Sequence, residues 1–278
     1  MSKRPVNTIL ITGCSSGIGY VTAKGLKERG YQVFASARKP QDVERLRAEG
    51  FKAVLLDLDD SASLKAAVEQ VLTWTGGSLD ALFNNGAFGQ IGAVEDLSRK
   101  MLREQFETNL FGTLELTNLV LPVMRRQGHG RILFNSSLLG FVALPYRGAY
   151  TASKFALEAL VDTLRLELHG TKIYPVLIEP GPILTKFREN AYVKFKQNLD
   201  PERSPHFKMY RLMEQRLAAE GPVVPFTLPP EAVLQKVIYA LERPCPKARY
   251  YVTVPTYLFA FLKRVLPTRA LDWILRKV

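Results

Sequence analysis

The feature that most constrains this 278-residue chain is a regular alternation of short apolar runs with longer segments of helical periodicity. Parallel strands need long helical crossovers between them, so such alternation predicts one parallel sheet with helices on its faces. We expect strands at residues 8–12, 31–36, 52–57, 79–84, 131–136, 173–179 and 249–253. We expect helices at residues 17–29, 41–49, 62–73, 99–127, 149–169 and 230–243. The sequence therefore predicts a single-domain α/β protein with a doubly wound parallel sheet.

A glycine-rich turn, Gly13-Cys-Ser-Ser-Gly17-Ile-Gly19, follows the first expected strand. Glycine allows backbone angles and close approaches that a Cβ would block. The free N–H groups at the start of the next helix attract anions, so the turn predicts a pyrophosphate site. Its order, G-x-x-x-G-x-G, differs from the dinucleotide fingerprint G-x-G-x-x-G. Glycines used for packing alone are the alternative interpretation.

A serine, a tyrosine and a lysine stand close together further along the chain. Tyr150 and Lys154 are four residues apart in an expected helix, so they share one face. A nearby cation stabilises a phenolate and lowers the tyrosine pKa toward neutrality. Ser137 ends the apolar run before this helix, so its hydroxyl is expected at the same place. Two hydroxyls and an ammonium suit the protonation of a carbonyl oxygen.

Taken together, these motifs closely resemble the short-chain dehydrogenase/reductase family, over nearly all of residues 8–253. The resemblance rests on six motifs in the family order, namely Thr12–Gly19, Asp57-Leu58, Asn84-Asn85-Gly86-Ala87, Thr108-Asn109-Leu-Phe-Gly112, the set Ser137, Tyr150 and Lys154, and Pro180-Gly181 with Thr185. It implies a Rossmann-like fold and hydride transfer between a nicotinamide cofactor and a carbonyl or alcohol. It also implies catalytic roles for Asn109, Ser137, Tyr150 and Lys154, with Asn109 holding a water that links the lysine to solvent. The implied cofactor contacts are Gly13, Ser15, Ser16, Gly17, Ile18, Gly19, Arg38, Lys39, Asp57, Leu58, Asn85, Gly86, Tyr150, Lys154, Pro180, Gly181, Ile183 and Thr185.

Two positions depart from the expected pattern. Gly86 and Ala87 are exchanged relative to the usual family order, which places a methyl group near the cofactor. Pro175 falls inside the expected strand 173–179, where it cannot donate a ladder hydrogen bond. We therefore expect a bulge or an unpaired position there.

The second expected strand indicates which cofactor is used. It ends at Ala37 without the carboxylate that accepts hydrogen bonds from a ribose 2′-hydroxyl. Arg38 and Lys39 follow at once and can bind a 2′-phosphate. We therefore expect NADP(H), with two solvated basic residues in a turn as the alternative.

The sequence implies a substrate that is a small apolar aldehyde, ketone or alcohol. By the resemblance, the apolar residues Leu138, Leu139, Phe141, Val142, Leu144, Tyr146, Ile183 and Phe187 line its pocket, although some belong to the core. Residues 182–229 are long, basic and bounded by prolines, and are expected to form a mobile lid. The expected function is NADP(H)-dependent carbonyl reduction or alcohol oxidation, as in the aldehyde reductases, retinol dehydrogenases and 17β-hydroxysteroid dehydrogenases of this family. A non-catalytic NADP(H)-binding sensor is the alternative, against which the complete Asn, Ser, Tyr and Lys set argues.

Composition narrows the partners and the compartment. The 38 basic and 26 acidic residues give a net charge of +12, yet no basic stripe with interleaved aromatics or nucleic-acid module is present, so nucleic acid is not expected. Cys14 and Cys245 are the only cysteines, which favours a reducing compartment. The N-terminal apolar run leads into the glycine turn without a cleavage site, so no targeting signal and a cytoplasmic location are expected. His129, His169 and His206 are scattered, and we expect no metal.

Two further surfaces have open interpretations. The resemblance implies a homodimer or homotetramer in which the helices near 99–127 and 149–169 pair with their counterparts across a dimer axis. The apolar residues available for this contact are Leu114, Leu116, Leu119, Leu121 and Val161. Burial of these residues within one subunit is an equal alternative.

We assign residues 1–254 to the cofactor-binding domain and residues 255–278 to an amphipathic helical extension. The extension carries aromatic and basic residues that suit peripheral contact with an anionic membrane. Packing against the enzyme body or a second subunit is the favoured alternative.

Overall fold

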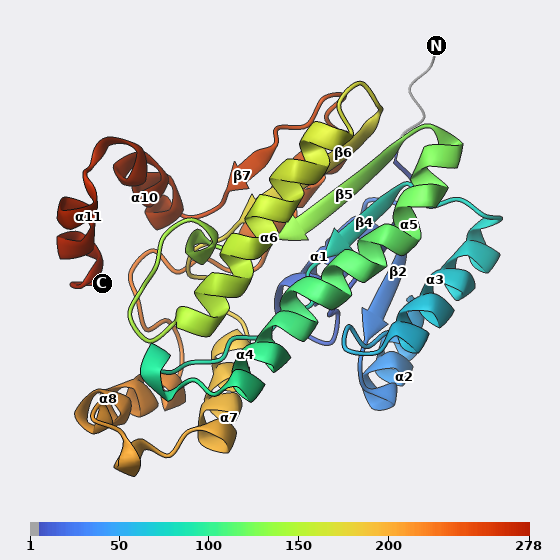
Figure 1. Cartoon of the computed structure of the whole chain (residues 1–278). Helices are drawn as coiled ribbons and strands as arrows, with labels where there is room; N and C mark the ends of the chain where they lie inside the picture. The colour runs from blue at the N-terminus through green and yellow to red at the C-terminus, as the bar shows by residue number, and fades with distance from the viewer. Residues whose placement is uncertain (1–5) are drawn as a thin grey trace.

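The computed structural model describes residues 6–278. The expectation about a targeting signal concerns a segment whose first five residues lie outside the described residues. A seven-stranded sheet runs through the molecule in the order β3-β2-β1-β4-β5-β6-β7, and every pairing is parallel (Figure 1). The strands are β1 (Thr8–Ile11), β2 (Gln32–Ala37), β3 (Lys52–Leu55), β4 (Ala81–Asn84), β5 (Gly130–Asn135), β6 (Ile173–Glu179) and β7 (Arg249–Tyr251). The predicted doubly wound sheet is confirmed.

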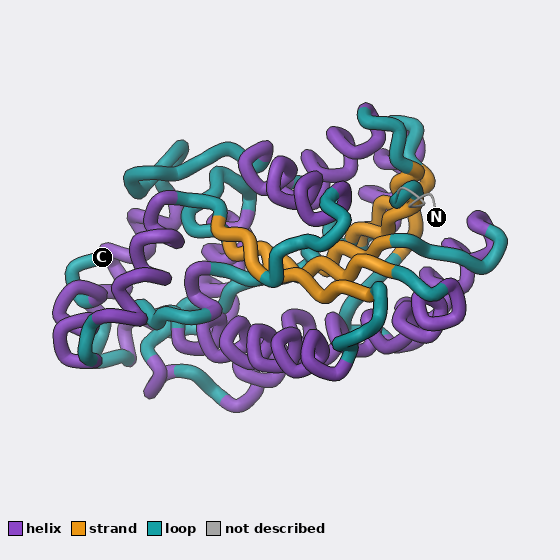
Figure 2. Tube along the Cα trace, turned by 90° about the horizontal axis from the view of Figure 1, so that it is seen from above, coloured by secondary structure: helices purple, strands orange, loops and turns teal. Residues whose placement is uncertain are grey.

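Helices cover both faces of this sheet, as Figure 2 shows from above. One apolar core joins the sheet to α1 (Gly17–Glu28), α2 (Pro40–Ala48) and α9 (Glu231–Glu242). The other core joins it to α3 (Ser61–Thr75), α5 (Thr113–Gln127) and α6 (Gly148–Glu167). The strands are therefore buried on both faces, which explains their nearly continuous apolar sequences.

The long helix predicted at 99–127 consists of three segments. After α4 (Arg99–Phe106), a π-helical stretch, Glu107–Gly112, precedes α5. At Gly112 the chain passes so close to the segment after β3 that a Cβ would lie 1.9 Å from the carbonyl oxygen of Leu58. Such π-helical segments often occur at functional sites, and this one contains Asn109.

Pro175 produces no bulge, so that part of its prediction is wrong. Residues of β6 pair one for one with β5, including Pro175 with Ile132. On the other side, β7 pairs only with Leu177, Ile178 and Glu179. Pro175 thus lies beyond the reach of β7, where the missing N–H group costs no ladder hydrogen bond with that strand.

Residues 182–229 form a helical cover beside the carboxyl ends of the strands (Figure 1). It contains α7 (Phe187–Asn198), a short 3-10 helix (Pro201–Arg203) and α8 (Phe207–Ala218). A bridge between Ile183 and Leu228 joins its two ends. Inside the cover, the buried Tyr210 hydroxyl donates to Asp96 at 2.5 Å and accepts from the N–H of Ala93 at 2.8 Å.

Two C-terminal helices, α10 (Val254–Val265) and α11 (Thr268–Leu275), follow β7 and project from one end of the molecule (Figure 1). Within the described residues no helix is both long and apolar enough to cross a bilayer.

Candidate active site

The predicted site residues gather at the carboxyl ends of the central strands. The glycine turn follows β1, Asn85 follows β4, Ser137 follows β5 and Pro180 follows β6. β1 and β4 are neighbours at the centre of the sheet. From β1 the strands continue toward one edge through β2 and β3, and from β4 they continue toward the other edge through β5, β6 and β7, so the strand order reverses between β1 and β4. Ligands of doubly wound proteins bind at such a topological switch point.

The glycine turn has the shape that a phosphate group needs. Gly13 and Gly17 have φ angles of +71° and +57°, which favour glycine. A Cβ on Gly19 would lie 2.3 Å from the carbonyl oxygen of Gly13, so only glycine fits there. Ser16 precedes α1 but makes no side-chain capping hydrogen bond. The first N–H groups of α1 therefore have no capping side chain and fit the pyrophosphate of a dinucleotide.

Basic side chains surround the outer side of this turn. Arg38 and Lys39 are exposed directly after β2, while Ala37 provides no carboxylate. Arg45 of α2 was not predicted, and its guanidinium donates to the carbonyl oxygen of Ser15 at 2.7 Å. The one feature of the sequence that could have indicated Arg45 is its position in the helix that follows Arg38. These contacts bring α2 and the glycine turn together around an electropositive corner.

A chain of hydrogen bonds connects the glycine turn to Lys154. The Thr12 hydroxyl accepts from the N–H groups of Asn85 and Gly86, both at 2.8 Å. The Asn85 side chain accepts from the Asn135 amide at 2.9 Å. The Lys154 ammonium donates to the Asn135 carbonyl oxygen at 2.6 Å. Thr12 begins the predicted motif Thr12–Gly19 but was not among the expected cofactor contacts, and Asn135 was in neither set.

Burial controls the protonation of Tyr150 and Lys154. Burial raises the pKa of Tyr150 to about 12, and a hydrogen bond with Ser137 opposes this shift. Burial also lowers the pKa of Lys154 to about 8, against the attraction of Glu158. The Lys154 nitrogen lies 5.8 Å from the centre of the Tyr150 ring. The expected lowering of the Tyr150 pKa by this cation is therefore wrong for this structure, in which burial raises that pKa and only the hydrogen bond with Ser137 opposes it.

An acidic cluster lies behind Lys154. Glu158, Glu179 and Asp162 all accept hydrogen bonds from Arg249, those to Glu179 and Asp162 at 2.6 and 2.5 Å. Burial, followed by the charge of Glu158, raises the pKa of Glu179 to about 8. One guanidinium thus faces three carboxyl groups, and Glu158 extends this negative charge toward Lys154.

Asn109 lies in the π-helical segment and is buried. Its amide nitrogen donates to the Phe88 carbonyl at 3.0 Å and to the Ser153 hydroxyl at 3.1 Å. Its side-chain oxygen accepts from the N–H of Phe88 at 3.1 Å. Asn109 therefore joins the segment after β4 to α6, beside Lys154.

Phe187, the first residue of α7, lies against Tyr150. The two rings are 5.3 Å apart in an edge-to-face arrangement. On the other side, a Cβ on Gly89 would lie 2.8 Å from the Phe187 ring. Phe187 therefore lies between Gly89 and the Tyr150 ring.

The remaining predicted residues are near the site but differ in their surroundings. Leu138 and Val142 pack with Phe259 and Leu275 of the C-terminal helices, and Tyr146 packs with the helical cover. Leu138, Val142 and Tyr146 therefore belong to apolar packing clusters and do not line an open pocket. The other positions are defined by backbone contacts or close packing, namely Asp57 N–H to the Ser63 hydroxyl at 3.0 Å, Leu58 beside Gly86, Pro180 accepting from Leu138 N–H at 2.7 Å, Gly181 against Thr253, Ile183 paired with Leu228, and Thr185 beside Gly17. Ser15 and Ile18 lie within the turn itself.

Other chemistry finds little support. Burial raises the pKa of the Cys14 thiol to about 12, which makes a reactive thiolate at neutral pH unfavourable. Among the described residues, no group of three or more His, Cys, Asp and Glu side chains is arranged to hold a metal ion. Both cysteines are free.

Comparisons with known proteins agree with this arrangement. The profile of the short chain dehydrogenase family matches residues 7–194. The uncharacterised oxidoreductase YbbO of Escherichia coli K12 is 44% identical over 269 residues, which cover 97% of this chain and 94% of that protein. An NADPH-dependent 3-dehydrocapnine reductase of Ornithobacterium rhinotracheale is 32% identical, covering 96% of this chain and 95% of that protein.

Among solved structures, a short-chain dehydrogenase from Streptomyces avermitilis superposes with a TM-score of 0.77 at 26% identity. The superposition covers 95% of this chain and 94% of that one. Sequence, fold and site motifs therefore agree, and the chain belongs to the short-chain dehydrogenase/reductase family of oxidoreductases.

Proposed function

We propose that this protein is an NADP(H)-dependent oxidoreductase that transfers hydride between the nicotinamide and an apolar aldehyde or ketone, or the matching alcohol. The observation that carries the proposal is the hydrogen-bonded path from the glycine turn through Asn85 and Asn135 to Lys154. It links the glycine turn to the buried Lys154, which lies beside the partly buried Tyr150. Such a pair has no use in a protein that only binds a nucleotide.

In the proposed reaction, a cofactor bound along the glycine turn supplies the hydride. Tyr150 donates its proton to the carbonyl oxygen, and the Ser137 hydroxyl holds that oxygen by a hydrogen bond. Lys154 stabilises the phenolate that Tyr150 becomes, because its ammonium is buried nearby. Asn109 positions the segment after β4 against α6 and holds the proposed water that reprotonates the pair.

Three features support a preference for NADP(H). Ala37 offers no carboxylate for a 2′-hydroxyl, while Arg38 and Lys39 are exposed at the same corner. Arg45 of α2 contacts the Ser15 carbonyl oxygen of the glycine turn, and its guanidinium also pairs with Glu49 at 2.8 Å. One relative is described as NADPH-dependent. A 2′-phosphate would make charge-assisted hydrogen bonds to these groups.

The apolar surroundings support a hydrophobic substrate. Phe187 covers Tyr150, and Leu139, Phe141 and Leu144 are partly buried beyond Ser137. An apolar chain that replaces Phe187 in this space keeps it free of water. A small sugar would instead leave its hydroxyl groups without partners there.

The proposal is tested by following NADPH and NADH oxidation at 340 nm, at matched concentrations, with linear aldehydes of two to twelve carbons. We expect turnover with NADPH and a catalytic efficiency that increases with chain length. A protein that binds NADPH but oxidises none of it, with the aldehydes and with a panel of ketones, steroids and retinoids, would be the sensor of the alternative hypothesis. A preference for sugars would contradict the apolar site.

A further inference from the structure

The C-terminal helix α10 has one apolar face that no part of the described chain covers. Val254, Tyr257, Leu258, Phe261 and Val265 are all exposed, and Phe261 is 61% exposed. Their spacing of three, four, seven and eleven residues from Val254 places them on a single stripe along the helix. An exposed stripe of large apolar side chains typically marks an interaction site.

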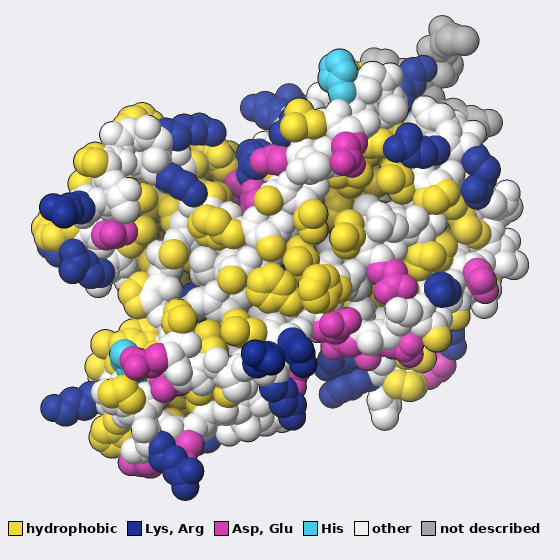
Figure 3. Space-filling model, in the orientation of Figure 1, with side chains coloured by type: hydrophobic (Ala, Val, Ile, Leu, Met, Phe, Trp, Pro, Cys, Tyr) yellow, Lys and Arg dark blue, Asp and Glu magenta, His cyan; other side chains and the backbone are white. Residues whose placement is uncertain are grey.

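The adjoining α11 continues this surface with an aromatic residue among cations. Trp273 is 58% exposed, and the Lys277 ammonium lies 3.5 Å from the centre of its ring. Residues 254–278 contain five basic side chains against one acid, Asp272. In Figure 3 the lobe at upper left shows these dark-blue side chains interspersed with yellow ones.

The opposite side of both helices is fixed to the enzyme. Phe259 and Leu275 are buried together with Leu138 and Val142, which follow the catalytic Ser137. The Lys263 ammonium donates to the carbonyl oxygen of Phe141. The interpretation that the extension packs against the enzyme body is therefore correct for the inner face of the two helices. This packing fixes the orientation of the exposed apolar stripe on the outer face.

We propose that the outer face of α10 and α11, formed by Tyr257, Leu258, Phe261, Val265 and Trp273 with its flanking cations, binds the surface of an anionic lipid membrane. Apolar and aromatic side chains beside basic ones are the chemistry that lies in a lipid headgroup region. Neither helix is long enough to span a bilayer, so the contact is peripheral.

The charge distinguishes a membrane from a second copy of this chain as the occupant. A twofold interface would place the same patch against itself, so the cations that flank Trp273 would face their own copies. Anionic headgroups would instead neutralise those cations. The charges on this surface thus favour lipid over self-association.

The test measures co-sedimentation of the full-length protein with vesicles of phosphatidylcholine alone and of phosphatidylcholine with 30% phosphatidylglycerol. We expect binding to the anionic vesicles that weakens at least tenfold in 0.5 M NaCl or with the neutral vesicles. The variants F261E/W273E and R269E/R276E should each reduce binding at least tenfold. The matched variants L212E and R216E, which alter exposed residues of α8, should bind like the wild type.

Circular dichroism and NADPH binding of each variant establish that it is folded. Absence of wild-type binding to the anionic vesicles would overturn the proposal. So would F261E/W273E binding as tightly as the wild type. A change from dimer to monomer in F261E/W273E, measured by light scattering without any vesicle binding by the wild type, would show that a second copy covers this face instead.

Discussion

Burial is the single-residue property that shapes the chemistry of this site. Tyr150 with a pKa of about 12 stays protonated at neutral pH, which is the form that a proton donor needs. Lys154 with a pKa of about 8 is charged only below that pH. In the proposed reaction, Tyr150 is the proton donor, and the charge of Lys154 that supports it is lost as the pH rises through about 8.

This pairing predicts the pH dependence of carbonyl reduction. Lys154 has its pKa lowered, so its charge is present below pH 8 and is lost as pH rises through about 8. We expect kcat/KM to decrease above pH 8. In K154R the arginine keeps its charge, so the decrease in kcat/KM above pH 8 should be absent. Glu179 also has a pKa of about 8, so E179Q is the control and should keep the limb. A profile that is flat to pH 10 in the wild type would contradict this assignment.

Phe187 gives a second prediction at the same scale. An aromatic pair such as Phe187 and Tyr150 contributes about 0.5–1.5 kcal/mol, which a substrate must give up to reach the hydroxyl. F187A should therefore lower KM for long aldehydes by about 2–10-fold, with KM for NADPH unchanged. V193A, on the exposed side of the same helix, is the matched control. An increase in KM for long aldehydes in F187A would show that the ring binds substrate rather than excluding it.

Single residues also show where sequence reasoning stops. The positions of Ser137, Tyr150 and Lys154 followed from spacing, because helical periodicity and strand ends fix them. The contact of Phe187 with Tyr150 joins a catalytic helix to a distant cover, and no periodic pattern encodes it. The link from Arg45 to Ser15 is of the same kind, since it depends on how α2 packs beside the glycine turn.

Among the elements, the turn between β2 and α2 determines the cofactor in this account. Arg38 and Lys39 lie at its start, and Arg45 lies further along α2. In A37D/R38N, a carboxylate that repels a 2′-phosphate is introduced at residue 37, and the proposed phosphate-binding cation at residue 38 is removed. Loss of one charge-assisted contact costs about 1.5–3 kcal/mol, so KM for NADPH should increase about 10–100-fold while NADH use improves.

The matched variant K24N removes a cation elsewhere on the surface and should change neither KM. A wild-type enzyme that uses NADH better than NADPH would contradict this account of the turn.

Most elements were predicted to within two residues of their observed ends, because each apolar run is a strand buried on both faces. The exception is the helix expected at 99–127. Its π-helical segment arises where Gly112 packs on the backbone of Leu58, a long-range contact that the helical periodicity does not reveal. Similarly, the cover 182–229 was expected from its length and prolines, but its attachment through Tyr210 and Asp96 depends on tertiary packing.

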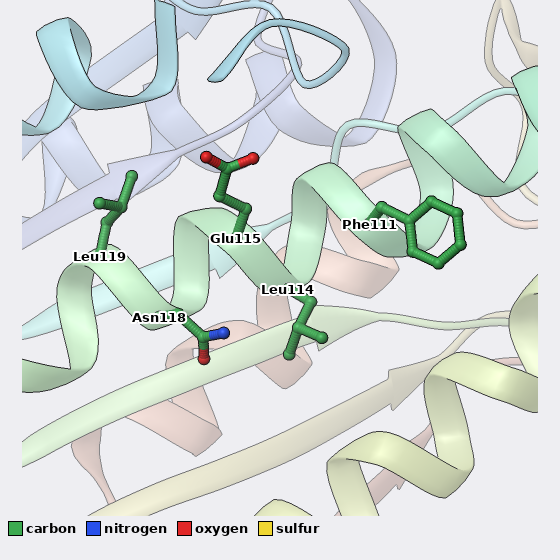
Figure 4. A pocket seen from close by; sticks show the side chains of 5 residues that line it. All are labelled: Phe111, Leu114, Glu115, Asn118 and Leu119. Carbon is green, nitrogen blue, oxygen red and sulfur yellow. The ribbon is translucent and has the colours of Figure 1, made fainter. Parts of the chain in front are cut away.

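At the scale of the whole molecule, α5 and α6 leave an apolar surface at the centre of the face in Figure 3. A hollow of about 350 Å³ lies on α5 and is lined by Phe111, Leu114, Glu115, Asn118 and Leu119 (Figure 4). Phe111 is 51% exposed. Leu116 and Val161, which we had considered for a dimer contact, are buried within the subunit. Any contact with a second copy therefore uses the outer residues.

We expect the protein to form a homodimer or homotetramer through this α5–α6 face. F111E/L160E should dissociate it, because each carboxylate would be buried at the interface without a partner. Light scattering at 10 μM measures the mass, and V193E, on the exposed face of α7, is the matched control. A wild-type monomer at that concentration would contradict the prediction.

The most direct test of the whole account is the rate of NADPH oxidation by Y150F with a long-chain aldehyde, at saturating NADPH. Phenylalanine keeps the buried ring but removes the proton that the carbonyl oxygen needs. We predict that the rate falls at least about 100-fold while the Kd for NADPH, measured by fluorescence, changes less than about twofold. A Y150F enzyme that keeps a tenth of the wild-type rate would show that Tyr150 is not the proton donor.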